Sequence, residues 1–121
     1  MTYPLIQVAL GGAIGASLRF LLGAQFGRPG FPVAVLSANI VGSFLMGLLV
    51  IWLSSRGLKG WEPFLLTGVL GGFTTFSAFS LETITLFERG QVGQAALYVG
   101  LSVGGAIGAL AMGIWLARTL A

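Results

Sequence analysis

The segment Gly71 to Thr83, GGFTTFSAFSLET, concentrates the side chains of this chain that could bind an ion. It holds two glycines, three phenylalanines, five hydroxyl side chains and one carboxylate, Glu82, within an otherwise apolar stretch. Hydroxyls are neutral hydrogen-bond donors, and the edges of phenyl rings carry a partial positive charge. Such groups can hold a small anion without trapping it as a full cation would. The segment therefore predicts a pathway for a small ion.

The spacing of these groups favours a helix after residue 75. Phe73, Phe76 and Phe79 recur every three residues, which places them along one drifting helical face. Hydroxyl residues wind beside them at the same spacing, namely Ser77, Ser80 and Thr83. We count Thr75 and Ser77 with the phenylalanines as candidate pathway residues.

The start of the segment is poorly suited to a continuous helix. Glycine costs up to about 1 kcal/mol relative to alanine in a helix, and β-branched threonine adds a little. Gly71 and Gly72 followed by Thr74 and Thr75 therefore favour a break, the alternative being an intact helix packed through its glycines. Irregular backbone at membrane depth is tolerated only inside protein or beside water, and its freed carbonyls can hold a hard cation such as Na⁺.

Other polar residues lie in apolar surroundings. Asn39 either links helices or lines a pore, because a buried amide needs hydrogen bonds. Arg19 is either a paired structural charge, which we favour, or part of an ion entrance, and Glu82 is either functional or hydrated near the end of its helix. Tyr98 and Ser102, four residues apart, place two more donors on one helical face.

These residues must be positioned by membrane helices. The chain has 121 residues, of which 56% are hydrophobic and 7% charged, and its mean hydropathy is +0.99. A soluble domain of this size could not bury so much apolar surface. Glycine, proline and charged residues delimit four stretches of the ~20 residues that a spanning helix needs, at about 4–26, 32–54, 61–87 and 93–116. We expect an all-α protein that forms a single membrane domain over residues 1–121, with a broken third helix.

The basic residues are balanced between the two ends of such a bundle. Three fall on the side of the termini and the second loop, and three on or toward the opposite side, respectively Arg56, Lys59 and Arg118, and Arg19, Arg28 and Arg89. The positive-inside rule then gives no preferred orientation. The balance predicts insertion in both orientations and an antiparallel homodimer.

Composition also excludes several classes of protein. Without cysteine or histidine the chain has no disulfide, thiol chemistry or usual transition-metal ligand, and no nucleophile–base pair for an enzyme. The few basic residues are scattered, so we expect no nucleic-acid partner. The N-terminus has no basic residue before its apolar run, so we do not expect a cleaved signal peptide.

Three motifs together resemble the signatures of the fluoride channel family Fluc, also called CrcB. They are GGAIGASLRF at 11–20, ANIVGSFLMG at 38–47 and GVLGGFTTFSAFSLE at 68–82. The resemblance extends over the whole chain in length, number of spans and motif order. It implies a dual-topology antiparallel homodimer in a prokaryotic cell membrane, which exports fluoride passively through two antiparallel pores.

The resemblance also implies roles for single positions. Asn39 matches the pore amide, Phe76 and Phe79 match the paired pore phenylalanines, and Tyr98 and Ser102 match polar positions of the fourth span. Some members of the family carry a further hydroxyl one turn beyond Ser102, where this chain has an alanine, Ala106.

Four further positions match the family motifs. Gly71 and Thr74 fall where members offer backbone carbonyls to a central structural Na⁺ at the dimer interface. Arg19 matches the arginine of the first motif, and Glu82 matches the carboxylate after the phenylalanines.

Two other classes of membrane protein fit the size of the chain. A small proton-coupled multidrug exporter also has four short spans, but it requires an acidic residue in the first span, where this chain has Arg19 and no acid. A subunit with only an assembly role would explain the many glycines but not the grouping of Asn39, Phe76 and Phe79.

Overall fold

The computed structural model describes residues 2–27 and 30–120, and every regular element in them is helical. Four segments are long and apolar enough to cross a membrane: Tyr3–Phe26, Val33–Ser55, Lys59–Glu88 and Val92–Leu120. The prediction of an all-α protein with four membrane helices is therefore confirmed. Arg28, which we counted in the charge balance, lies outside the described residues.

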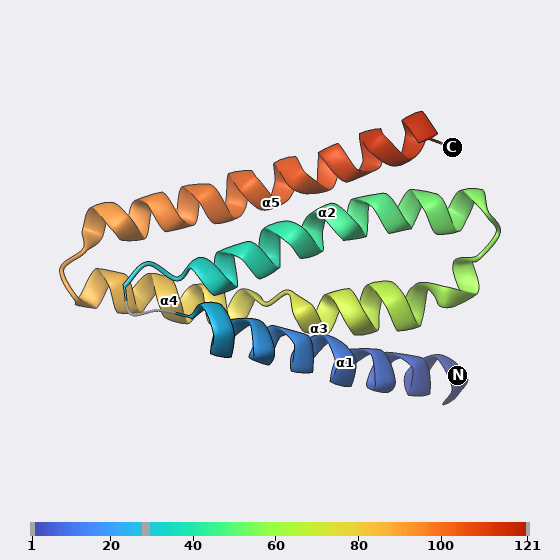
Figure 1. Ribbon diagram of the computed structural model, residues 1–121, viewed down its shortest axis with the longest axis horizontal. Coiled ribbons are helices and arrows are strands. Elements are labelled where there is room, and N and C mark those ends of the chain that lie inside the picture. The colour runs from blue at the N-terminus through green and yellow to red at the C-terminus, as the bar shows by residue number, and fades with distance from the viewer. Residues whose placement is uncertain (1, 28–29, 121) are drawn as a thin grey trace.

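The helices form an elongated bundle in which both termini lie at the same end (Figure 1). α1 (Thr2–Phe26) packs against the third segment, and α2 (Val33–Ser55) packs along most of α5 (Val92–Leu120). The turn after α2 lies at the end with the termini, and the turn between α4 (Phe76–Glu88) and α5 lies at the other end. Consecutive membrane helices are thus antiparallel, as their short connections require.

The third segment consists of several helical pieces. A single 3₁₀ turn, η1 (Lys59–Trp61), precedes a wider π-helix, η2 (Pro63–Leu70), which continues into the short α3 (Gly71–Phe73). Thr74 and Thr75 then have extended backbone, with φ/ψ of −90°/151° and −151°/131°, before α4 begins at Phe76. The segment therefore has two helical halves joined by two extended residues.

Glycines end two of the helices. Gly57 follows α2 with φ +68°, and Gly90 follows α4 with φ +80°, a region that other residues rarely adopt. After each glycine the next amide donates to a carbonyl five residues back, from Leu58 to Leu53 and from Gln91 to Leu86. This is the Schellman arrangement, which satisfies carbonyls at the end of a helix.

Other glycines allow the helices to pack with their backbones in contact. A Cβ added at Gly15 of α1 would strike the Val69 carbonyl and come within 2.8 Å of the Phe73 nitrogen, and one added at Gly113 of α5 would strike the Phe44 carbonyl. Close approach of backbones is how membrane helices associate in the absence of a hydrophobic driving force. The glycines place the first half of the third segment on α1, and α5 on α2.

The packing at Gly15 leads to a prediction about stability. Gly15→Ala should force α1 away from η2 and α3 and destabilise the protein by about 1–3 kcal/mol, the usual cost of overpacking. The matched control is Gly23→Ala on the same helix, because a Cβ at Gly23 meets nothing within 4 Å. Thermal unfolding in detergent measures both variants. Equal melting temperatures for Gly15→Ala and Gly23→Ala would contradict the packing argument.

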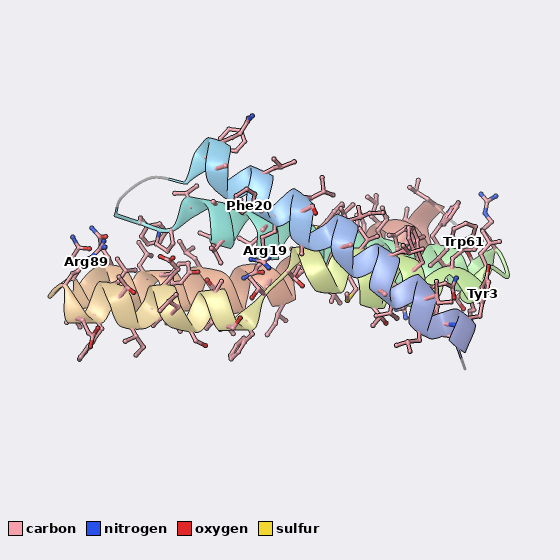
Figure 2. The ribbon with its side chains drawn as sticks, turned by 90° about the horizontal axis from the view of Figure 1, so that it is seen from below. Tyr3, Arg19, Phe20, Trp61 and Arg89 are labelled. Atoms are coloured by element: carbon pink, nitrogen blue, oxygen red, sulfur yellow. The ribbon has the colours of Figure 1, made fainter. Side chains whose placement is uncertain are left out.

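Little of the apolar surface is buried within one chain. Fully buried large side chains are limited to Tyr98, Leu53 and Leu86 among the described residues, whereas Phe76 is 76% exposed. Figure 2 shows side chains projecting from all sides of the bundle, with Arg19 near its middle and Arg89 at one end. In a membrane this exposed surface would face lipid or another protein chain.

Candidate functional site

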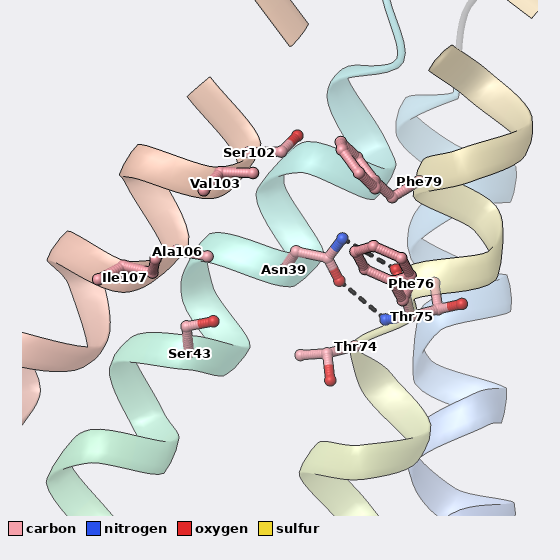
Figure 3. A pocket seen from close by; sticks show the side chains of 10 residues that line it. All are labelled: Asn39, Ser43, Thr74, Thr75, Phe76, Phe79, Ser102, Val103, Ala106 and Ile107. Carbon is pink, nitrogen blue, oxygen red and sulfur yellow. Dashed lines mark hydrogen bonds between the residues drawn. The ribbon is translucent and has the colours of Figure 1, made fainter. Parts of the chain in front are cut away.

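Asn39 of α2 binds the extended residues between α3 and α4. Its Nδ2 donates to the Thr75 carbonyl at 3.1 Å, and its Oδ1 accepts from the Thr75 N–H at 2.8 Å. The amide thus satisfies both backbone groups of one residue, as Figure 3 shows. These contacts join α2 to the third segment, which is one of the two roles that the sequence left open for Asn39.

This pairing changes the hydrogen bonding of the residues around it. In a continuous helix the Thr75 N–H would donate to the carbonyl of Gly71, four residues back. Because it donates to Asn39 instead, the Gly71 carbonyl loses its helical partner. The first half of the segment ends at Thr74, whose N–H and Oγ1 both donate to the Leu70 carbonyl at 2.9 Å.

Thr75 also begins the second half of the segment. Its Oγ1 accepts from the Ala78 N–H at 3.2 Å, the contact of a helix N-cap, and lies 3.1 Å from the Ser77 hydroxyl. Threonine is a favoured residue at this position because its oxygen satisfies an amide that has no helical acceptor. One residue therefore receives a bond from α2 and caps α4.

A cavity of about 340 Å³ adjoins the extended residues. Its walls come from α2, the extended residues, α4 and α5, and they are formed by Asn39, Ser43, Thr74, Thr75, Phe76, Phe79, Ser102, Val103, Ala106 and Ile107 (Figure 3). The lining contains amide, hydroxyl and aromatic groups but no charged side chain. Such a cavity offers donors and ring edges to a small anion without a fixed countercharge.

Aromatic rings continue from the cavity toward the end of the bundle at the α4–α5 turn. The ring centroids of Phe76 and Phe79 are 5.3 Å apart, and those of Phe79 and Tyr98 are also 5.3 Å apart. Phe31, before the start of α2, meets Tyr98 edge to face at 5.7 Å. These separations are typical of interacting aromatic pairs. The four rings form a row contributed by α4, α5 and the residues before α2.

Two buried hydroxyls next to this row lack a partner. Tyr98 is 0% exposed and Ser102 is 6% exposed. Among the described residues no group hydrogen-bonds the Tyr98 hydroxyl or the Ser102 Oγ. Buried polar groups are normally satisfied, so two such donors on one face of α5 are available to a ligand.

The other hydroxyls of α4 are used within the helix. Ser80 donates to the Phe76 carbonyl at 3.0 Å, and Thr83 donates to the Phe79 carbonyl at 2.8 Å. These bonds hide polar groups from lipid. Ser77 is exposed and contacts only Thr75 among the hydroxyl side chains.

Arg19 and Glu82 lie outside the cavity that contains Asn39. Arg19 Nε donates to the Gly72 carbonyl at 3.3 Å, and its side chain helps to line a separate cavity of about 490 Å³ between α1 and α2. Glu82 is half-buried on α4, beyond Phe79. The structure thus brings together seven of the predicted residues, namely Asn39, Thr74, Thr75, Phe76, Phe79, Tyr98 and Ser102, whereas neither Arg19 nor Glu82 lines their cavity.

Sequence analysis missed one polar and one aromatic residue of the site, in addition to the apolar lining residues Val103 and Ile107. Ser43 lines the cavity one turn after Asn39, a spacing that could have identified it. Phe31 belongs to the aromatic row but lies outside the predicted spans. Its position next to Pro32, the start of the second predicted span, was the one feature of the sequence that could have identified it.

Comparison with known proteins places the chain in one family. Residues 6–114 match the family model described as CrcB-like protein, Camphor Resistance (CrcB). The chain is 61% identical to a fluoride-specific ion channel FluC of Roseobacter denitrificans, with 94% of each chain covered. It is 59% identical to the protein of the same name from a Ruegeria species, over 98% of this chain and 97% of that one. A protein of that name from Agrobacterium fabrum is 49% identical over 93% of this chain and 94% of its own.

Proposed function

Because the chain belongs to the CrcB family, we propose that it is a fluoride channel that lets fluoride leave the cell passively across the inner membrane of a prokaryote. The relatives named as fluoride-specific channels match nearly its whole length. The observation that carries the proposal is the cavity without charged side chains that is lined by Asn39, two phenylalanines and hydroxyl residues. A channel must bind its ion strongly enough to admit it and weakly enough to release it, and neutral donors meet both requirements.

The test is fluoride efflux from liposomes that contain the purified protein, followed with a fluoride electrode. We expect efflux without ATP or a proton gradient. No efflux from correctly assembled protein would overturn the proposal. Protonophore-sensitive uptake of a cationic dye would instead favour the multidrug exporter, which the cavity does not support because no carboxylate lines it.

We assign the pathway to the cavity and the aromatic row. Phe76 and Phe79 present ring edges, and Asn39, Thr75, Tyr98 and Ser102 supply polar groups along the way. Ala106 offers no hydroxyl to this wall, in which Ser43 of α2 and Ser102 of α5 are the serine side chains.

We assign the remaining predicted residues to the entrances of this pathway. Arg19 lines a cavity of its own with residues of α1 and α2, where a cation can attract an anion before it enters. Ser77 and Glu82 lie on α4, outside the cavity lining. Of the two acidic residues of α4, Glu88 ends the helix and Glu82 lies one turn after Phe79, where it can orient hydroxyls or water.

The channel would be an antiparallel homodimer of dual topology with two pores. Phe76 is 76% exposed and Leu81 is 66% exposed next to the open cavity, a surface that a second copy would cover. The balanced basic residues support insertion in both orientations. A cysteine added to the C-terminus should react with a membrane-impermeant reagent from both sides of the membrane in equal amounts. Labelling from one side alone would contradict dual topology.

A Na⁺ ion would hold the two subunits together at the extended residues. Gly71 is exposed, and its carbonyl has lost its helical donor because the Thr75 N–H binds Asn39. The carbonyl of Thr74 belongs to an extended residue next to it. Carbonyl oxygens are suitable ligands for a hard cation, so the carbonyls of Gly71 and Thr74 of each subunit are suitable ligands for Na⁺. The ion would neutralise their partial charges and fix the ends of the two helical halves.

Replacing Na⁺ by a bulky organic cation should therefore reduce fluoride efflux at least about tenfold, a loss of about 1.4 kcal/mol. Efflux is measured in liposomes prepared and assayed in N-methylglucamine salts, and the activity should return when Na⁺ is added. An unchanged rate after thorough removal of Na⁺ would count against the carbonyl site while leaving fluoride conduction intact.

A further inference from the structure

A groove between the C-terminal ends of α2 and α5 has no part in the proposed fluoride pathway. It has a volume of about 490 Å³ and is lined by Leu48, Leu49, Trp52, Ser55, Arg56, Ala117 and Leu120. It shares no lining residue with the cavity that contains Asn39. Both helices end here, beside the two termini (Figure 1).

The groove is apolar along its length and polar at one end. Leu48 and Leu49 lie within the membrane-capable part of α2, whereas Arg56 follows its last residue, Ser55. Arg56 lies eight positions after Leu48, which corresponds to about 12 Å at the helical rise of 1.5 Å per residue. The leucines therefore lie at the depth of acyl chains, and Arg56 lies at the depth of lipid headgroups.

The polar end carries a positive charge. The Arg56 guanidinium lies over the Trp52 ring, 5.6 Å from its centroid. Arginine stacked in this way keeps its hydrogen-bond donors free for a phosphate. Lys59 and Arg118 lie at the same end of the bundle. Among the described residues at this end, Glu62 is the one acidic side chain, so basic residues are in excess. No ion pair satisfies Arg56 within the part of the chain that the structure describes.

We propose that this groove binds one anionic phospholipid. Its phosphate binds Arg56, its headgroup lies beside Ser55, and one acyl chain lies along Leu48 and Leu49. Apolar walls suit a lipid chain, and the excess of basic residues selects an anionic headgroup over a zwitterionic one. The site is independent of the ion that the channel conducts.

Native mass spectrometry of the purified protein with added phosphatidylglycerol or phosphatidylcholine tests this assignment. The wild type should retain phosphatidylglycerol about fivefold better, the effect expected of one basic residue near a membrane surface. Arg56→Gln should remove this preference. Leu49→Trp, which fills the groove, should reduce the retention of both lipids.

The matched control is Arg89→Gln, which removes an exposed arginine at the opposite end of the bundle and should leave the preference unchanged. Circular dichroism confirms that each variant is folded. Equal retention of the two lipids by the wild type, an unchanged preference in Arg56→Gln, or an equal loss in Arg89→Gln would overturn the proposal. Full retention of lipid by Leu49→Trp would show that the lipid binds elsewhere and would also contradict the proposal. Absence of bound lipid from the wild type would contradict it as well, and is the result expected if a second copy of the chain occupies the groove.

Discussion

Asn39→Ala is expected to reduce fluoride efflux about 100-fold or more. The variant removes the donor and the acceptor that satisfy the Thr75 carbonyl and N–H. Leaving a buried polar group without a partner costs about 1–3 kcal/mol, so two such groups cost enough to favour another backbone conformation. The simplest one is helical, in which the Thr75 N–H returns to the Gly71 carbonyl.

The change would affect both parts of the site at once. A helical Thr75 no longer caps α4 and shifts Phe76 and Phe79 relative to α5, and a Gly71 carbonyl bonded within the helix is less available to Na⁺. We therefore expect weaker dimers as well as slower efflux. Efflux from liposomes and the dimer fraction in detergent measure the two effects.

The matched control for Asn39 is Ser43→Ala. Ser43 lines the same cavity from the next turn of α2, so its replacement alters the wall without touching the Thr75 backbone. It should change efflux by less than about threefold, well under the 1.4 kcal/mol of a tenfold effect. Similar losses in Ser43→Ala and Asn39→Ala would show that the cavity wall, rather than support of the extended residues, is what matters.

Phe79→Ile is expected to slow fluoride efflux about tenfold or more while the proposed dimer remains assembled. Phe79 stands at the centre of the aromatic row, 5.3 Å from both Phe76 and Tyr98. Isoleucine fills much of the same space, but it has no ring edge with partial positive charge. An anion would lose favourable electrostatics at this point, and each 1.36 kcal/mol added to the barrier slows passage tenfold.

The matched control for Phe79→Ile is Phe87→Ile, the same substitution on the same helix. Phe87 is 59% exposed and lines none of the cavities described above. Its replacement should leave the efflux rate unchanged. Fluoride efflux from liposomes is measured for both variants and normalised to the amount of dimer. A wild-type rate in Phe79→Ile would argue against ring-edge coordination.

The helices of this protein could be predicted from its sequence because their signals are local. Long apolar runs interrupted by glycine, proline and charge leave the backbone no alternative to helices in lipid, where each polar backbone group needs an internal partner. The prediction of four membrane helices and the family resemblance are confirmed. The π-helical winding of η2 was not predicted, because it depends on how residues 63–70 pack against α1 rather than on their own preferences.

The site was predictable as a set of residues but not as an arrangement. The motif from Gly71 to Glu82 identified the glycines, threonines and phenylalanines together. Nothing in that motif shows that Asn39, 36 residues before Thr75, satisfies the backbone of the extended residues. Nor does local spacing show that Arg19 binds the Gly72 carbonyl and lies apart from the cavity.

The sequence by itself determined that the chain consists of membrane helices, which of its stretches can form them, and which residue types are available to an ion, because these follow from hydropathy and from side-chain chemistry. The tertiary structure decided which polar groups are used within the fold and which remain free. Thr75 binds Asn39 and thereby releases the Gly71 carbonyl, and α5 brings the hydroxyls of Tyr98 and Ser102 beside the phenylalanines of α4. Hydrogen bonds and ring contacts act over a few ångströms, so their partners are settled only when distant segments pack together.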